Sequence, residues 1–463
     1  MRKKVADLRP NGRWLGTFLA LVMLLTLGLT ACSSDATPTP VAVSPTATPA
    51  KLTTVNSLCP PQDDPNNPVT ITWSFWGDDS EVAINNRLKK QFESTCPGIR
   101  VNVLHDTWSN YPNLLRNEWV GDKAPDVMFL DNIPTWASLG ILDKINPYID
   151  RDKIDINDFY PGLLNMFRYN GSLYGLPRDN DTKVIYVNLD LLKEAGINVP
   201  QAGWTWQDLR EAALKLTKRD SQGKVTQYGF AFEPNTWWRL WVWQNGGELY
   251  DSFNPPTPPT QLLLNNKAAS DGVQFFADLI NVDKVTPGYS DMDSSDKIAK
   301  LFADRKLAMA FGNHAQVPIY GSTNGLHWDV APLPTGKKRA NVLGGAGYGI
   351  GANSKHKDEA WAFVNWLTGP IGQALFSDTG LMVSSLKSVR ENNIFLRMQP
   401  YNTQVFLQET EVGHPYPEFN FSQEVDALMD QALIPAWQGK VPVSDVFASL
   451  PAQVEPYFAK GRK

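Results

Sequence analysis

The chain has 463 residues, a formal charge of −5 at pH 7 and 42% hydrophobic residues, which suits a folded protein with more than one domain. Residues 1–31 contain five basic residues and one acidic residue, so the chain that follows them has a charge of −9. An acidic surface repels phosphates, and no basic run interleaved with aromatic residues occurs. We therefore expect no nucleic-acid partner.

The first 31 residues have the pattern of an export signal. Basic residues between Arg2 and Arg13 precede an apolar stretch from about Trp14 to Leu29, and small residues lead to Cys32. A signal peptide that ends in this way is similar to the lipobox of bacterial lipoproteins. We expect removal of residues 1–31, lipidation of Cys32, and an exported protein held at the outer face of the cell membrane or in the periplasm. An uncleaved membrane anchor is the alternative.

The segment after Cys32 has the composition of a spacer. Thr, Pro, Ala and Ser dominate from Ser33 to about Pro68, and hydrophobic residues show no periodicity there. At about 3.1 Å per residue, an extended proline-rich spacer of this length reaches roughly 110 Å. Residues 32–68 are therefore predicted to be a lipidated stalk.

Cys59 and Cys96 are the two cysteines besides Cys32. A pair of cysteines in an oxidising compartment is most simply a disulfide, which would stabilise the fold by about 3 to 4 kcal/mol. Two free thiols, or a structural metal site with other ligands, are the alternatives.

Beyond the stalk, strand patterns alternate with helix patterns. The first predicted strand, 69–76, places its hydrophobic residues at every second position, whereas 127–130 is continuously apolar, as in a strand that is covered on both faces. Further strands are predicted at 99–103, 307–311 and 328–330. Strands that alternate with helices indicate an α/β fold with open, mainly parallel sheets.

Three helices have recognisable beginnings or ends. Asp78 and Glu81 are spaced for a capping box after the first strand, and Thr205 and Asp208 are spaced in the same way before a second amphipathic helix. A third helix pattern covers 360–367 and ends at a Gly-Pro pair.

Common catalytic and metal-binding motifs are absent from the sequence. The five histidines are scattered, and no HExxH, CxxC, EF-hand, GxSxG or phosphate-loop spacing occurs. We expect no metal centre and no cofactor. The glycines between 344 and 351 indicate close backbone approach in a strand or cleft wall. Neighbouring carboxylates such as Asp179 and Asp181 suit acid-base cleavage of glycosides, or serve as caps and solvated loops.

Tryptophan is abundant, and four of the 16 tryptophans fall within seven residues. They are Trp237, Trp238, Trp241 and Trp243, and we expect that such a cluster is not entirely core. Indole faces suit the apolar faces of sugar rings, while Asp, Asn and Arg side chains match sugar hydroxyls.

Nine motifs follow one another along the mature chain: ITWSFWG (71–77), APDVMFLD (124–131), LYGLPRDND (173–181), VIYVNLDLLKEAGI (184–197), PQAGWTWQDLREAALKL (200–216), WQNGGEL (243–249), FADRKLAMAFGN (302–313), VAPLPTG (330–336) and KHKDEAWAFVNWL (355–367). Their order resembles that of the extracellular solute-binding proteins of ABC importers, in the family of the maltose-binding protein and other sugar receptors. The likeness extends from about Val69 to Gln453.

The resemblance implies a two-lobed periplasmic-binding-protein-like fold of type II, in which each lobe has a central sheet flanked by helices and hinge strands join the lobes. The first lobe would comprise 69–178 and 314–367, and the second 179–313 and 368–463. Ligands of open α/β sheets bind beyond the carboxyl ends of the strands.

Transferred position by position, the resemblance implies ligand contacts at the strand ends and crossings. The implied residues are Trp76, Gly77, Asp78, Asp131, Asn132, Arg178, Asp179, Asp181, Trp237, Trp238, Asn313, His314, Gly345 and Tyr348. Many sugar-binding relatives carry a tryptophan soon after the AM…G motif, where this chain has Asn313 and His314 instead. Trp237 or Trp238 is expected to substitute for it.

The resulting hypothesis is a monomeric receptor, not an enzyme, that encloses a sugar or oligosaccharide and delivers it to the transmembrane subunits of an ABC permease. Two alternatives stay open at this point. One is a surface-anchored glycoside hydrolase or lyase. The other is the same receptor fold with a metal, polyamine, peptide or glycerol phosphate ester as its cargo.

Overall fold

Two five-stranded sheets organise the chain, which is represented by a computed structural model. The structure describes residues 59–60, 64–77, 79–108, 110–121, 123–252, 259–391, 402–417, 419 and 421–461. The expected signal peptide, Cys32, most of the expected stalk and Asp78 lie outside the described residues. Residues 54–463 belong to one compact unit.

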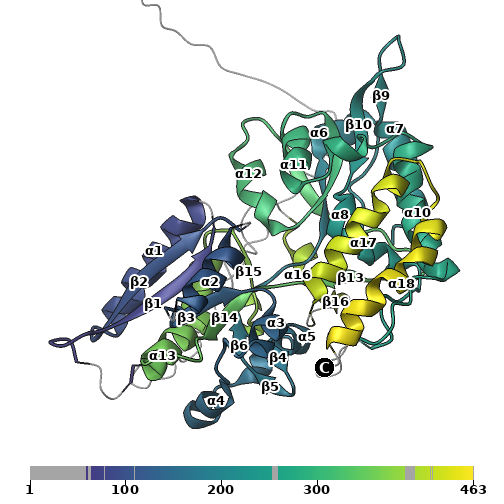
Figure 1. The fold of residues 1–463 in the computed structure, drawn as a ribbon. Helices are drawn as coiled ribbons and strands as arrows, with labels where there is room; N and C mark the ends of the chain where they lie inside the picture. The colour runs from purple at the N-terminus through teal and green to yellow at the C-terminus, as the bar shows by residue number, and fades with distance from the viewer. Residues whose placement is uncertain are drawn as a thin grey trace, which may run out of the picture. The chain divides into compact units, whose positions relative to one another are not determined.

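The first sheet has the strand order β2-β1-β3-β14-β6 (Figure 1). β1 is parallel to β2 and β3, whereas β14 is antiparallel to β3 and β6. The strands are β1 (Val69–Trp76), β2 (Ile99–Asp106), β3 (Val127–Leu130), β6 (Gly175–Pro177) and β14 (Gly347–Ile350). The helices that accompany this sheet are α1 (Asp79–Thr95), α2 (Tyr111–Val120), α3 (Ile133–Ser138), α4 (Asn146–Asp152), α5 (Pro161–Met166), α13 (Lys357–Thr368), α14 (Pro370–Ser377) and α15 (Lys387–Glu391).

The second sheet has the strand order β12-β8-β11-β10-β9. β10 and β11 are parallel, and β8 runs antiparallel to β11 and β12. The strands are β8 (Val184–Asn188), β9 (Lys218–Arg219), β10 (Val225–Ala231), β11 (Leu307–Gly312) and β12 (Trp328–Ala331). The helices of this part are α6 (Leu189–Glu194), α7 (Trp206–Leu216), α8 (Pro234–Trp237), α9 (Arg239–Gln244), α10 (Lys267–Asn281), α11 (Ser295–Ala303), α12 (Val317–Ser322), α16 (Gln404–Thr410), α17 (Ser422–Trp437) and α18 (Val443–Gly461).

Each sheet has its own hydrophobic core, so the described chain forms two lobes. The strands predicted from alternation and from the continuous apolar run are confirmed: Ile71, Trp73 and Phe75 are fully buried on β1, and all four residues of β3 are buried. The predicted capping box of α7 is also confirmed, because Thr205 and Asp208 exchange side-chain and backbone hydrogen bonds.

The chain passes from the first lobe to the second at residues 178–183, returns at residues 332–346, and passes again between α15 and α16. Short ladders accompany these passages, namely β7 (Asp179–Asn180) with β15 (Val383–Ser384), and β13 (Asn341–Leu343) with β16 (Gly413–Pro415). A further small ladder, β4 (Arg168–Tyr169) with β5 (Ser172–Leu173), lies within the first lobe.

The chain crosses between the lobes at residues that differ from those expected from the sequence. β12 was expected in the first lobe, but it pairs with β8 and completes the second sheet. α14 was expected in the second lobe, but Phe376 of this helix packs in the first core. Residues 314–342 therefore pack with the second core, and residues 368–389 mostly with the first.

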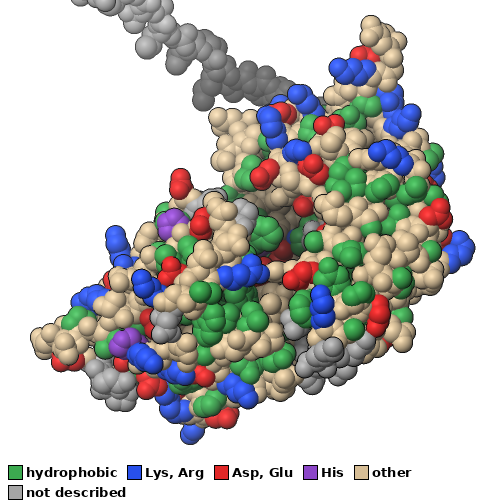
Figure 2. Space-filling model, in the orientation of Figure 1, with side chains coloured by type: hydrophobic (Ala, Val, Ile, Leu, Met, Phe, Trp, Pro, Cys, Tyr) green, Lys and Arg blue, Asp and Glu red, His purple; other side chains and the backbone are tan. Residues whose placement is uncertain are grey.

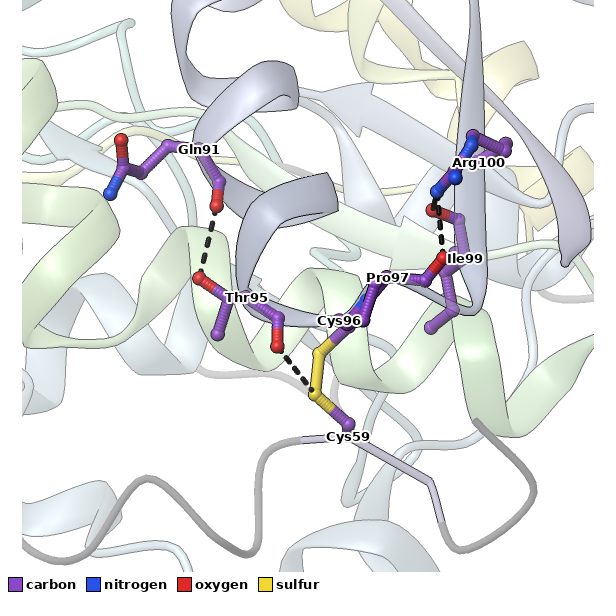
Figure 3. The surroundings of a disulfide bond; sticks show 7 residues. All are labelled: Cys59, Gln91, Thr95, Cys96, Pro97, Ile99 and Arg100. Carbon is purple, nitrogen blue, oxygen red and sulfur yellow. Dashed lines mark hydrogen bonds between the residues drawn. A yellow bond between two sulfur atoms is a disulfide. The ribbon is translucent and has the colours of Figure 1, made fainter. Parts of the chain in front are cut away.

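A disulfide between Cys59 and Cys96 ties the chain that enters the first lobe to the end of α1 (Figure 3). The predicted pairing is thus confirmed. Next to it, the guanidinium of Arg100 donates to the carbonyls of Pro97 and Ile99, at 2.8 and 3.1 Å. Because β2 begins at Ile99, the disulfide lies at the edge of the first sheet opposite the carboxyl ends of β1 and β2.

Within the described ranges, no helix has the combination of length and apolar character that would let it cross a membrane.

Candidate functional site

A short connection joins the two sheets at the edges where β6 ends and β8 begins. β6 ends at Pro177 beside the end of β3 and the beginning of β14, and β8 begins at Val184 beside the end of β11. Six residues separate β6 from β8, so the edges that carry the strand ends of both lobes lie close together. Figure 2 shows a hollow in the described surface between the lobes, where hydrophobic and acidic side chains are visible.

Trp76 and Asp131 contribute the first lobe's side of this boundary. Trp76 ends β1 and is half-buried, with its indole 4.1 Å from the ring of Phe129 between centroids. Asp131 follows β3, and its carboxylate accepts the backbone N–H of Asn132 at 2.8 Å. Burial raises the pKa of Asp131, and the nearby carboxylate of Asp179 raises it further. A half-buried carboxylate of this kind is a strong acceptor for a ligand's hydroxyl.

Asn132 has a structural role at both ends of its amide. Its oxygen accepts the backbone N–H of Thr135 and caps α3, while its nitrogen donates to the hydroxyl of Ser422 in the second lobe at 3.0 Å. The side chain that was expected to contact a ligand therefore joins the two lobes in this structure.

Arg178 and Asp179, which were expected to contact a ligand, bind each other and Glu81. The guanidinium lies 2.6 Å from a carboxylate oxygen of Glu81 and 2.6 Å from Asp179. It is also stacked between the rings of Phe129 and Phe376, with its central carbon 3.9 and 4.4 Å from their centroids. The other oxygen of Asp179 accepts the backbone N–H of Ala346. This pairing leaves little of either charged group for a ligand.

Oδ1 of Asn180, at the first crossing, is one of the buried polar atoms that have no hydrogen-bond partner among the described residues. Two more are Oδ1 of Asp181, next to it in the chain, and Nδ1 of His314, just after β11. The other carboxylate oxygen of Asp181 binds the ammonium of Lys183 at 2.9 Å. Burial lowers the pKa of His314, against the opposing effect of the nearby carboxylates, and favours a neutral imidazole. Since buried polar groups are normally hydrogen-bonded, these atoms mark a place for a ligand or water.

Trp237 and Glu233 continue the site along the second lobe. The ammonium of Lys183 lies 3.5 Å from the centroid of the half-buried Trp237 ring. Glu233 lies two residues after the end of β10. Burial raises its pKa to about 7, although Lys183 and a hydrogen bond from Trp237 oppose the shift. Our sequence reasoning missed Glu233 and Lys183. The strand pattern that ends at Ala231 was the signal that could have located Glu233.

Trp238 lies in the core rather than at a ligand site. Its side chain is fully buried, and its indole N–H donates to Asp430 at 2.8 Å. Trp241 is also fully buried, and Trp243 is 1% exposed. The expectation that the cluster is not entirely core is confirmed by Trp237, whose indole reaches the surface. The other three indoles are core, and every residue of the short helix α9 is buried.

The remaining residues that were expected to contact a ligand have structural roles in capping, core packing and close backbone approach. Asn313 caps the short turn at 314–316, and Tyr348 is 1% exposed and packs against Phe129. A Cβ atom at Gly345 would lie 2.4 Å from the carbonyl oxygen of Asp179, and one at Gly77 would lie 2.7 Å from Cβ of Glu81. Close approach therefore requires glycine at both positions, as was expected for the region around Gly345.

Two further hollows lie at the opposite edges of the sheets. One is lined by residues that include Arg219, Val225 and Lys284, near the beginning of β10. The other is lined by residues that include Asp126 and His356, near the beginning of β3. Because ligands of open α/β sheets bind beyond the carboxyl ends of the strands, we place the candidate site at the boundary instead. Among the described residues, no group of three His, Cys, Asp or Glu side chains is arranged to hold a metal ion.

Known proteins resemble this chain in sequence and in fold. Residues 77–374 match the family model described as bacterial extracellular solute-binding protein. An uncharacterised lipoprotein in the oleD 5' region of Streptomyces antibioticus is 24% identical over 67% of this chain and 69% of its own length. The arabinooligosaccharide-binding protein of Bacillus subtilis is 25% identical over 76% of this chain and 75% of its own length. The ABC substrate-binding protein Lmo0181 of Listeria monocytogenes, solved with cycloalternan, superposes with a TM-score of 0.76 at 20% identity, over 85% of this chain and 100% of its own.

Proposed function

Because this chain belongs to the bacterial extracellular solute-binding proteins, we propose that it holds a sugar or oligosaccharide between its lobes and delivers it to the membrane subunits of an ABC permease. The protein is a receptor: the ligand is bound and released without chemical change. Cys32 carries the lipid that keeps it at the outer face of the membrane, and it works as a monomer.

The observation that carries the proposal is the pair of partnerless buried atoms, Asp181 Oδ1 and His314 Nδ1. A carboxylate oxygen accepts hydrogen bonds, and a neutral imidazole nitrogen accepts or donates one, so both match the hydroxyls of a sugar. The carboxylate of Asp131 supplies a third polar contact, and the half-buried indole of Trp76 supplies an apolar surface for the ring. Gly77 and Asp78 follow Trp76 in the same strand exit.

Some of the relatives are named for sugars or were solved with them. One of them is named for the arabinooligosaccharides it binds, and the Listeria protein of similar fold was solved with cycloalternan. On the second lobe, Trp237 and Glu233 would complete the contacts. A ligand that contacts both lobes binds more tightly when the lobes are closed around it, and it therefore shifts the equilibrium from an open to a closed state. A ligand with equal affinity for the two states would leave that equilibrium unchanged.

A thermal-shift screen of neutral mono- and oligosaccharides tests the proposal. A ligand at 100 times its dissociation constant adds about 2.7 kcal/mol to the free energy of unfolding and raises the melting temperature. The protein is then incubated with the sugar that gives the largest rise in melting temperature, and the sugar is analysed by chromatography for cleavage. Saturable binding with recovery of intact sugar supports the receptor. Cleavage of many sugar molecules per protein molecule would support an enzyme instead. If no sugar raises the melting temperature, the proposed sugar ligand is rejected.

A further inference from the structure

An indole at the end of β2 has no structural role in the described fold. Trp108 is 66% exposed, and it is the one aromatic ring among the exposed large hydrophobic side chains of the described residues. It packs with neither of the two hydrophobic cores that these residues form. Exposing a tryptophan to water in this way brings the fold no stability, because the hydrophobic effect favours its burial.

Trp108 lies at the edge of the first lobe that carries the candidate site. β1 and β2 are parallel and in register, so Trp76 at the end of β1 lies beside Asp106 at the end of β2. Trp108 follows Asp106 by two residues, which places its backbone at most roughly 7 Å farther along the strand direction. The same edge therefore carries a half-buried indole next to Asp131 and an exposed indole farther out.

The backbone around Trp108 is held in place. The carboxylate of Asp106 accepts the backbone N–H of Thr107 at 2.7 Å and the side-chain amide of Asn110 at 3.4 Å. The backbone N–H groups of Asn110 and Tyr111 both donate to the carbonyl of Thr107 as α2 begins. Because the flanking backbone is already ordered, a ligand that covers the indole costs little backbone conformational entropy.

We propose that Trp108 forms an outer subsite that stacks on a sugar unit beyond the one held at Trp76 and Asp131. The inference rests on the proposed function and makes it more specific, because it assigns a second sugar unit to Trp108. The ligand is then an oligosaccharide, and affinity rises with chain length until the unit that reaches Trp108 is present.

The test is a length series of the sugar found in the screen, from one unit to five, measured by calorimetry on the wild-type protein and on Trp108→Ala. The wild-type protein should gain affinity with each added unit up to a limit. W108A should lose about tenfold in affinity for the longest ligands, equivalent to about 1.4 kcal/mol, and less than twofold for the shortest. Val120→Ala is the matched control, because Val120 is 85% exposed on α2 of the same lobe and should leave every affinity unchanged.

The outcomes separate the inference from the function on which it rests. Equal affinities of wild type and W108A at every length would overturn the outer subsite and leave the sugar receptor intact. An equal loss at every length would also overturn it, because Trp108 would then act at the inner sugar. Absence of binding by every sugar and every length would overturn both proposals.

Discussion

Lys183 covers one face of Trp237, with its ammonium 3.5 Å from the ring centroid, and the same ammonium binds Asp181 at 2.9 Å. The side chain of Lys183 is 3% exposed. One face of the indole is thus occupied by a buried cation. The contact between Lys183 and Trp237 links the first crossing to α8.

The ion pair of Lys183 with Asp181 should be sensitive to removal of one partner. Lys183→Met leaves the carboxylate of Asp181 without its cation, and we expect a loss of about 3 kcal/mol in the free energy of unfolding, measured with urea. Adding Asp181→Asn should restore part of this loss, because the buried charge is then removed. Lys267→Met is the control: Lys267 is 87% exposed, its pair with Asp271 joins adjacent helical turns, and its removal should cost about 0.5 kcal/mol or less. An additive double variant would contradict the coupling.

Asp131 is expected to weaken the fold slightly and to strengthen ligand binding. Burial raises its pKa, so the charged carboxylate is unfavourable where it stands. Asp131→Asn keeps an oxygen for the N–H of Asn132, and we expect unchanged or slightly higher stability together with at least a tenfold loss of sugar affinity. Thermal denaturation and calorimetry on the same preparation measure both quantities. Unchanged affinity would remove Asp131 from the site.

Trp238 should affect stability and not recognition. Trp238→Ala empties a fully buried position and breaks the hydrogen bond to Asp430, so the free energy of unfolding should fall by about 3 to 5 kcal/mol. Trp238→Phe retains most of the volume and loses the hydrogen bond, with an expected cost of about 1.5 kcal/mol. Urea denaturation measures both. A large fall in sugar affinity for the folded Trp238→Phe protein would show that the residue contacts the ligand after all.

Glu233 should make stability depend on pH in the weakly acidic range. Its pKa is raised from 4.5 to about 7 in the folded protein, so between these values the folded state holds a proton that the unfolded chain releases. The contribution of Glu233 to the free energy of unfolding therefore falls as pH rises from about 4.5 to 7, and it stays constant above pH 7. Glu233→Gln should match the wild type near pH 4.5 and exceed it by about 2 kcal/mol at pH 8, allowing for solvent screening at a half-buried group. Urea denaturation across this range would contradict the assignment if the difference between the proteins did not change with pH.

Much of the local structure could be predicted from the sequence. The alternation in Val69–Trp76 and the apolar run Val127–Leu130 gave strands at those places, and the spacing of Thr205 and Asp208 gave a helix start. Each of these signals depends on residues within a few positions of one another. The motif order likewise led to the family and the fold.

The candidate site was predicted less completely. Trp76 and Asp131 end or follow strands of the first sheet, Asp181 lies in the connection between the lobes, and Trp237 and His314 belong to the second lobe. Their contact with a ligand stays a prediction. The resemblance implies a ligand contact for Arg178, whereas the structure pairs it with Glu81, which is 97 residues away. No local pattern in the sequence indicates that pairing. Lys183 and Glu233 were missed because neither belongs to a motif; each is significant only through its neighbours in space.

The sequence by itself determined the export pattern, the cysteine pair, the strands, the helix starts and the family, since all of these are written in composition, order and short-range spacing. Only the tertiary structure decided which charged groups pair internally and which polar atoms stay without partners. It also decided that Trp238 is core while Trp108 is exposed. The physical reason is that burial and pairing depend on residues far apart in the chain, whose proximity exists only after the two sheets have formed and the connection at 178–183 has brought their edges together.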